Sequence, residues 1–189
     1  MVLLYFHYIL SWVDARTNLP TGQGGLPKGN VARKSNQAGA STLLQGTVLS
    51  DTRISTHLLE SYRQTDYQVH GPVPFSLNIG LPSEPLLQLY KQHRCDCAAF
   101  ITACNPYSQK LAPAVNAQRH LDLMADLTSR SLIFVEGMGI GQDPDWPGEV
   151  SCLIFGLALE ASRVLGRKFN QNALVWCDQD AKPELVLLR

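Results

Sequence analysis

Acidic side chains are almost missing from the first 50 residues of the chain. Asp14 is the only acid there, and four basic residues give this segment a net charge of +3. Because the whole chain is formally neutral, residues 51–189 carry −3. Phosphate binding needs clustered Lys and Arg, which neither a mildly acidic domain nor a short, sparse basic segment provides. We therefore expect no nucleic-acid partner.

Long hydrophobic runs are also missing. The most apolar stretch, residues 1–13, is shorter than the roughly 20 residues of a membrane-spanning helix, and it contains His7. No basic region precedes it and no small-x-small cleavage site follows it, so it does not resemble a secretory signal. We expect a cytoplasmic protein with no membrane partner.

The cysteines do not form the even set that a disulfide framework requires. There are five, and they lie on or beside short apolar segments, which is typical of reduced cytosolic thiols. The chain also has no G-x-S-x-G, Walker or H-E-x-x-H motif, so these signatures of hydrolase, nucleotide and zinc chemistry are absent. Gly137-Met-Gly-Ile-Gly141 has the wrong spacing for a dinucleotide site, and the sequence after it opens no helix. We expect no cofactor.

Metal ligands are present only in incomplete patterns. Asp143, Asp145 and Glu149 lack the alternation and length of a calcium loop, and His93-x-Cys95-x-Cys97 lacks a fourth, more distant zinc ligand. We expect no metal. In the same loop, Trp146 beside Pro147 is predicted to close the core beneath the loop.

The composition divides the chain into an extension and a domain. Residues 20–46 are rich in Gly, Pro, Ser, Asn and Gln and show no apolar period, so they cannot bury enough surface to order themselves. We expect residues 1–49 to be a disordered or dispensable N-terminal extension. Residues 50–189 are predicted to form a single α+β domain, because the chain as a whole is 45% apolar and only 17% charged.

Periodicity and turn residues predict the elements of this domain. The order of the predicted elements indicates a mixed sheet of about five or six strands with three or four helices packed on it, not a doubly wound parallel fold. Asp51 or Ser55 is the expected cap of the first helix, and Asn170 the expected left-handed residue after the last one. Residues 137–148 are expected to be a glycine-rich loop. The helices are expected from residue 55, after Pro82, and over 113–129 and 159–169, and the strands over 75–79, 97–104, 132–135, 150–157, 173–177 and 184–188.

Polar residues gather after the central strand. The loop that follows it holds Asn105, Tyr107, Ser108 and Lys110. On the next helix, Asn116, Arg119 and His120 share one face because they are spaced i, i+3, i+4. A helix start and an Arg side chain both suit an anionic group, so Arg119 is a candidate for binding carboxylate or phosphate. The alternative is structural: Asn105 and Asn116 hold the turn, and Arg119 extends along the surface.

Two adjacent amides, Gln171 and Asn172, precede the strand at 173–177. They line a pocket together with Asn105 and Asn116, or they hydrogen bond the backbone of a neighbouring loop.

Five motifs of polar and aromatic residues stand out in this domain. They are Tyr62-Arg63-x-Thr65-Asp66-Tyr67, Phe100-Ile101-Thr102-Ala103-x-Asn105-Pro106, Asn116-x-x-Arg119, Trp146-Pro147-x-Glu149-x-Ser151 and Phe169-x-Gln171-Asn172-Ala173. Together they resemble a bacterial family known as domain of unknown function 3293. The resemblance covers about residues 58–176 and implies no activity, but it groups these residues at strand ends and loops, where sites tend to lie. Cys104 departs from the family's usual Trp, His120 from an Asn, and Asn170 from a Gly.

Two functions of different classes are compatible with these residues. The first is a site for a small polar, anionic or nucleotide-like ligand, which the protein binds or transforms, with Glu149 as the only evident general base. The second is a non-catalytic interaction or regulatory module that acts through an exposed strand edge such as residues 184–188. The residues of the proposed ligand site are Tyr67, Asn105, Asn116, Arg119, Glu149, Gln171 and Asn172.

Overall fold

The computed structural model describes residues 54–189. The predicted extension of residues 1–49 lies outside the described residues and stays a prediction, and so does a helix cap at Asp51. Among the described residues, no helix combines the length and the apolar character needed to cross a bilayer.

The structure has four α-helices and one short 3₁₀ helix, and all of them except α5 begin at a capping serine or a proline. The Ser55 and Ser83 hydroxyls each accept a backbone N–H from the first turn of the helix that follows them. Pro85 and Pro113 stand in first turns, where a missing N–H costs nothing. The helices are α2 (Thr56–Gln64), α3 (Glu84–His93), α4 (Pro113–Ser129) and α5 (Leu159–Lys168), and the 3₁₀ helix is η1 (Pro106–Ser108).

The end of α5 confirms the expected left-handed Asn170. Its φ is 59°, its N–H donates to the carbonyl of Arg167, and the N–H of Gln171 donates to that of Gly166. This pair of bonds is a Schellman motif, which satisfies the last carbonyls of the helix. The motif also turns the chain so that Gln171 and Asn172 enter the sheet at a defined place.

One seven-stranded sheet holds the domain together, with the strand order β2-β1-β4-β5-β3-β6-β7. The α+β class is confirmed, but the sheet has seven strands where five or six were expected, because the four-residue β1 is too short to show a period. The strands are β1 (Asp66–Val69), β2 (Phe75–Leu77), β3 (Ala98–Thr102), β4 (Phe134–Ile140), β5 (Glu149–Phe155), β6 (Ala173–Cys177) and β7 (Pro183–Leu187).

Every strand pair is antiparallel, which corrects the expectation of a mixed sheet. The helical connections do join strands that run parallel, β3 to β4 through α4 and β5 to β6 through α5. These strands are not neighbours, however. β5 lies between β3 and β4, and β3 lies between β5 and β6, so each parallel pair is separated by an antiparallel strand.

Strand β4 extends into the segment that was expected to be a loop. Gly137 and Gly139 lie within β4 and pair with β1, and only residues 141–148 connect β4 to β5. A Cβ atom on Gly137 would collide with the carbonyl oxygen of Gln68 and lie 2.7 Å from Cε2 of Phe100. Glycine is needed here for close packing, not for a turn.

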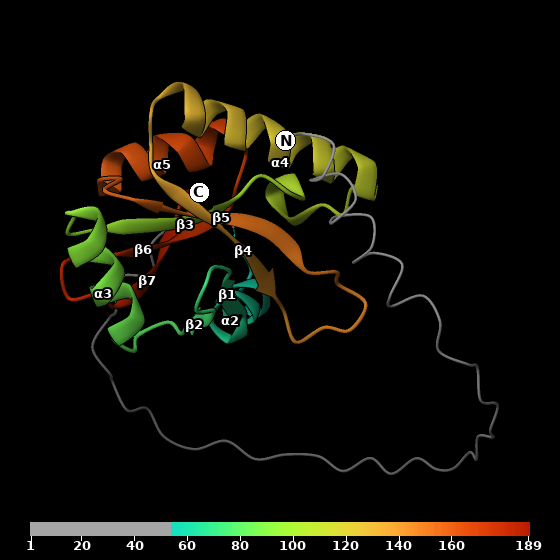
Figure 1. Ribbon diagram of the computed structural model, residues 1–189. Helices are drawn as coiled ribbons and strands as arrows, with labels where there is room; N and C mark the ends of the chain where they lie inside the picture. The colour runs from blue at the N-terminus through green and yellow to red at the C-terminus, as the bar shows by residue number, and fades with distance from the viewer. Residues whose placement is uncertain (1–53) are drawn as a thin grey trace, which may run out of the picture. The chain divides into compact units, whose positions relative to one another are not determined.

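Helices cover both faces of the sheet (Figure 1). One core layer packs α4 and α5 against Ala99 and Ile101 of β3. The other packs α3 and β1 against Ala98 and Phe100 of the same strand. Strand β3 is thus covered on both sides, as its continuous apolar run predicted. α2 lies on the α3 side of the sheet (Figure 1). Its residues line a cavity against the sheet.

Candidate functional site

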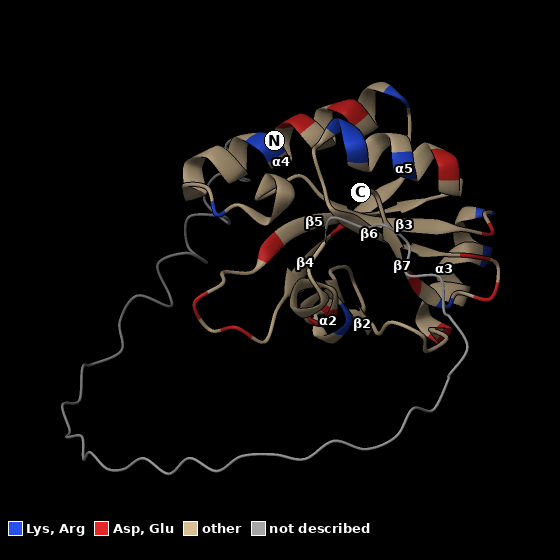
Figure 2. Ribbon diagram, turned by 180° about the vertical axis from the view of Figure 1, so that it is seen from behind, with Lys and Arg blue, Asp and Glu red and all other residues tan. Residues whose placement is uncertain are grey.

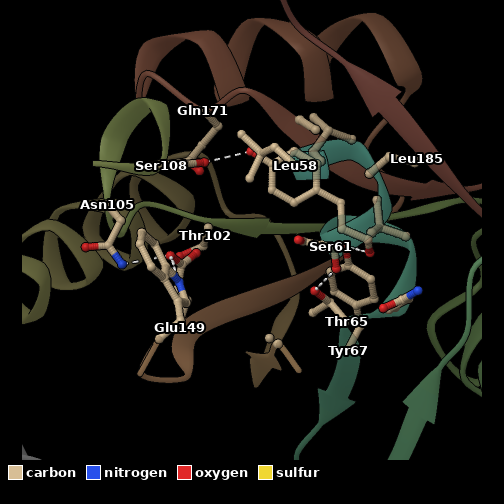
Figure 3. Close-up of a pocket in the computed structure, with 18 of the residues that line it drawn as sticks. Leu58, Ser61, Thr65, Tyr67, Thr102, Asn105, Ser108, Glu149, Gln171 and Leu185 are labelled. Atoms are coloured by element: carbon tan, nitrogen blue, oxygen red, sulfur yellow. Dashed lines mark hydrogen bonds between the residues drawn. The ribbon is translucent and has the colours of Figure 1, made fainter. Parts of the chain in front are cut away.

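A cavity of about 480 Å³ lies between α2 and one end of the sheet. The antiparallel register brings the end of β3 beside the start of β5, with Thr102 opposite Ser151, and the end of β4 beside the same point, with Gly139 opposite Glu149. The start of β6 and Leu185 of β7 complete the wall. Side chains from distant parts of the sequence therefore meet at this end of the sheet (Figure 3).

Glu149, the first residue of β5, is the principal charged group of the cavity. Its Oε1 accepts hydrogen bonds from Nδ2 of Asn105, at 2.7 Å, and from Nε1 of Trp146, at 3.1 Å. Among the described residues, none hydrogen bonds to Oε2. Burial raises the pKa of the carboxyl group, and the two donors partly oppose this shift because they stabilise the charged form.

Asn105 is the buried centre of the polar wall. Its Oδ1 accepts the backbone N–H of Leu111 at 2.9 Å and Nδ2 of Asn116 at 2.8 Å, while its own backbone N–H donates to Oδ1 of Asn116 at 2.9 Å. With Nδ2 bound to Glu149, all of its polar side-chain atoms are engaged. The side chain that orients the carboxylate is therefore itself fixed.

The backbone around Asn105 is strained. Asn105, Tyr107 and Ser108 have φ values of 44°, 54° and 56°, a region that residues other than glycine seldom occupy. Such conformations cost of order 1–3 kcal/mol each and cluster at ligand-binding and active sites. The strained turn directs Ser108 toward the cavity, where its Oγ lies 2.7 Å from the hydroxyl of Tyr62.

A second polar cluster joins α2 to the sheet. Nδ2 of Asn172 donates to the hydroxyl of Tyr62 and to Oγ of Ser108, each at 3.1 Å. The hydroxyl of Tyr67 donates to the carbonyl of Tyr62 at 2.7 Å. Burial raises the pKa of both tyrosines, so the hydroxyls are protonated at neutral pH.

The structure brings together most of the predicted site residues. Some line the cavity, and others only hydrogen bond to residues that line it. Four of them line the cavity: Tyr67, Asn105, Glu149 and Gln171. Asn116 and Asn172 lie directly behind the wall and hydrogen bond to residues that line it. Asn116 and Asn172 therefore position lining residues and do not themselves line the cavity.

Arg119 does not line the cavity. Its Nε donates to the carbonyl of Ala103 at 2.6 Å, and one terminal nitrogen donates to the carbonyl of Phe169 at 2.7 Å. The guanidinium thus ties the loop after β3 to the end of α5. His120, from the same predicted face, is buried against the sheet, with Nε2 3.8 Å from Glu136.

Several cavity residues were not predicted as site residues. Tyr62 and Ser108 form the second polar cluster, and Phe100 and Thr102 of β3 supply part of the wall. Tyr62 stands in one of the five motifs and Ser108 in the loop after the central strand, but the two are 46 residues apart, so the sequence did not indicate that they pair. Trp146 is half-buried in the loop, as expected of a plug, but its indole N–H also holds Glu149.

The structure shows no metal or thiolate chemistry in the part that it describes. No group of three His, Cys, Asp or Glu residues within residues 54–189 is arranged to hold a metal ion. The five cysteines are free. Cys104, which is near Glu149, has its pKa raised to about 11 by burial, so it is a neutral thiol at physiological pH.

Comparison with known proteins agrees with the resemblance drawn from the motifs. No curated protein and no solved structure matches the chain. A family model described as "Protein of unknown function (DUF3293)" matches residues 101–174, which hold Asn105, Glu149 and Gln171 of the cavity wall. The segment of residues 101–174 therefore belongs to the DUF3293 family.

Proposed function

We propose that the cavity beneath α2 binds a small polar molecule, and that Glu149 is the residue that contacts it most directly. The observation that carries this proposal is the asymmetry of the carboxylate. Oε1 is held by Asn105 and Trp146, whereas Oε2 has no hydrogen-bond partner among the described residues. Oε2 is therefore free to accept from a ligand, and a hydrogen bond to a charged, partly buried carboxylate contributes to affinity.

The size and the rigidity of the cavity support the proposal. Small-molecule sites commonly enclose roughly 300–1,000 Å³, and the 480 Å³ found here falls in that range. The supporting residues are fixed in advance, because Asn116 holds Asn105, and Asn172 holds Tyr62 and Ser108. A wall that is already ordered loses little conformational entropy when a ligand binds.

Glu149 is also the group placed to transfer a proton if the bound molecule reacts. A general acid or base works best when its pKa lies near the working pH, and burial moves the pKa of Glu149 upward in that direction. The catalytic role that the sequence suggested for Glu149 therefore remains part of this proposal.

The structure lends no support to an anionic or nucleotide-like ligand. Arg119, the residue expected to hold the anion, donates to two backbone carbonyls instead. No Lys or Arg is found among the described residues that line the cavity.

A cavity-filling variant tests this function. Ala173 lines the cavity, so Ala173→Leu should occupy part of it, whereas the same change at the exposed Ala161 of α5 should not. We expect a thermal-shift screen of polar metabolites to yield a compound that stabilises the wild-type chain and Ala161→Leu but not Ala173→Leu. Stabilisation of all three proteins alike would place the binding elsewhere and contradict the proposal.

The second candidate function, an interaction module, rests on strand β7. This strand is the last in the sheet and pairs with β6 alone, so one side of its backbone is open to another strand. The N–H of Gly80 already binds the carbonyl of Pro183, which leaves residues 184–187 as the open stretch. The N–H of Leu187 points to this open side, because Leu188 and Val186 are the residues that pair with β6. Capture of a stoichiometric partner that Leu187→Pro abolishes would favour this function.

A further inference from the structure

We infer that the ligand of this cavity is a small organic cation, such as a primary amine with an apolar body. The inference rests on the proposed function and adds the class of ligand to it. Three independent features support it: the charge of the lining, the hydrogen-bonding groups left open, and the aromatic side chains.

The lining has acidic side chains and no Lys or Arg among its described residues, and its histidine, His57, is exposed on α2. Glu149 and Asp143 are its carboxylates. Figure 2 shows acidic residues in the loop between β4 and β5 and at the start of β5, which is the side of the sheet where the cavity lies. A ligand with a positive charge would meet an uncompensated negative group in a partly desolvated place, where attraction is stronger than in water.

The basic residues near the cavity are engaged elsewhere. Arg119 holds two carbonyls, and Nζ of Lys110 donates to the carbonyl of Asp145 at 2.9 Å. Arg189 lies over the ring of Tyr107, 4.4 Å from its centroid, and donates to Asn172. None of the three is a lining residue, so Glu149 has no partner of opposite charge within the wall.

The side-chain N–H donors next to Glu149 are used within the protein. Nδ2 of Asn105 and Nε1 of Trp146 donate to Glu149, and Nε2 of Gln171 donates to the carbonyl of Cys104 at 2.9 Å. Oε2 of Glu149 is left as an acceptor. A ligand that brings N–H donors matches this wall, whereas a carboxylate or phosphate would find acceptors where it needs donors.

Aromatic side chains form much of the remaining lining. Tyr62, Tyr67, Phe100 and Trp146 all contribute, and Tyr67 meets Phe100 edge to face at a centroid distance of 5.5 Å. The faces of such rings attract cations by about 0.5–2 kcal/mol each and also pack against an apolar body. The hydrogen bond from its indole N–H keeps the ring of Trp146 beside the Glu149 carboxylate.

Three probes of one shape and different charge test the inference. They are 2-phenylethylamine, which is cationic at neutral pH, 2-phenylethanol, which is neutral, and phenylacetate, which is anionic. Each is titrated into the full chain while the indole N–H signal of Trp146 is followed by NMR, so that binding is located in the cavity. We expect the amine to bind at least about tenfold more tightly than the alcohol, and phenylacetate to bind least.

Glu149→Gln and Glu136→Gln form the matched pair of variants. The amide introduced by Glu149→Gln would keep an oxygen that accepts from Asn105 and Trp146 but would remove the charge. Glu136 lies on the other face of the sheet, against α4, and its substitution removes the same charge. We expect Glu149→Gln to abolish the preference for the amine and leave the alcohol's affinity nearly unchanged, while Glu136→Gln changes neither.

The other possible outcomes distinguish an error in the ligand class from an error in the proposed binding function. If the alcohol or phenylacetate shifts the Trp146 signal as strongly as the amine, the cation inference is wrong while the proposed binding function stands. If none of the three probes binds at millimolar concentration, both the inference and the proposed function are contradicted for ligands of this size. The ranking on the wild-type chain suffices even if Glu149→Gln folds poorly.

Discussion

At the scale of single residues, the position of Glu149 at the cavity is expected to lower the stability of the fold. A carboxylate with one unpartnered oxygen in a partly buried place opposes folding, and the structure holds it there through Asn105 and Trp146. The substitution Glu149→Gln removes the charge but keeps the shape of the side chain, so it should stabilise the protein.

The gain from Glu149→Gln should depend on pH. Burial raises the pKa of Glu149 in the folded state above its ordinary value of 4.5, so the folded state binds more protons than the unfolded state above that pH. The stability of the wild-type chain thus falls as pH rises through this window, whereas the amide of the variant does not titrate. We expect the variant's advantage in urea denaturation to be small near pH 4 and to grow toward pH 8.

The comparison must be made as a difference between variant and wild type at each pH. Burial lowers the pKa of His120 to about 4, so its contribution to stability has the opposite sign and is lost as pH falls below about 6.5. Because His120 is present in both proteins, its contribution cancels when the stability of the wild type is subtracted from that of the variant. A difference that stays constant from about pH 4 to about pH 8 would show that the pKa of Glu149 is not raised.

At the scale of elements, strand β4 contains a matched pair of glycines. A Cβ on Gly137 would collide with the backbone of β1 and the ring of Phe100, whereas a Cβ on Gly139 would lie 3.6 Å from Thr65, an ordinary contact. We expect Gly137→Ala to cost about 2–3 kcal/mol of unfolding free energy, as overpacking does. Gly139→Ala should be neutral or stabilising by up to about 1 kcal/mol, because alanine loses less backbone entropy. Chemical denaturation of both variants measures this.

The outcome for this pair also tests the position of β1. Equal effects of the two substitutions would mean that β1 does not pack against Gly137 as the register of Gln68 opposite Met138 requires. In that case the wall of the cavity that Tyr67 supplies would be displaced as well.

The same elements show which parts of the fold can be predicted from the sequence. The bounds of α4 follow from Pro113 and an apolar period, because helical signals are local. Strand β1 alternates half-buried and buried residues for only four positions, too few to establish a period. The strand order depends on which distant segments pair, and no local pattern specifies that.

The candidate site likewise has features that the sequence indicates and features that it does not. Asn105, Glu149 and Gln171, which the sequence suggested for one site, line the same cavity, because the end of β3 lies beside the starts of β5 and β6. The role of Arg119 could not be predicted. Its two partners are backbone carbonyls 16 and 50 residues away. Every residue has such a carbonyl, so the sequence does not indicate which of them accepts a hydrogen bond.

At the scale of the whole domain, α2 is held less firmly than the other α-helices, although α3 buries Leu86 on the same face of the sheet. α4 and α5 bury Leu123, Leu127 and Leu165 completely against one face. On the other face, α2 has no fully buried residue among its nine. Hydrogen bonds hold α2 instead: Tyr62 with Ser108 and Asn172, Tyr67 with the carbonyl of Tyr62, and Gln142 with the carbonyl of Gln64.

This asymmetry predicts that α2 opens independently of the rest of the domain. Segments with few buried apolar contacts unfold locally at a lower free energy than the core. We expect the amides of α2 to exchange with deuterium through local opening, well before those of the fully covered strand β3. Because α2 lines the cavity, saturating 2-phenylethylamine should slow exchange in α2 and leave β3 unchanged, since a ligand stabilises only the states that bind it. Equal protection of α2 and β3 in the free protein would show that the cavity is closed by a cooperative part of the fold, and ligands would then enter by another path.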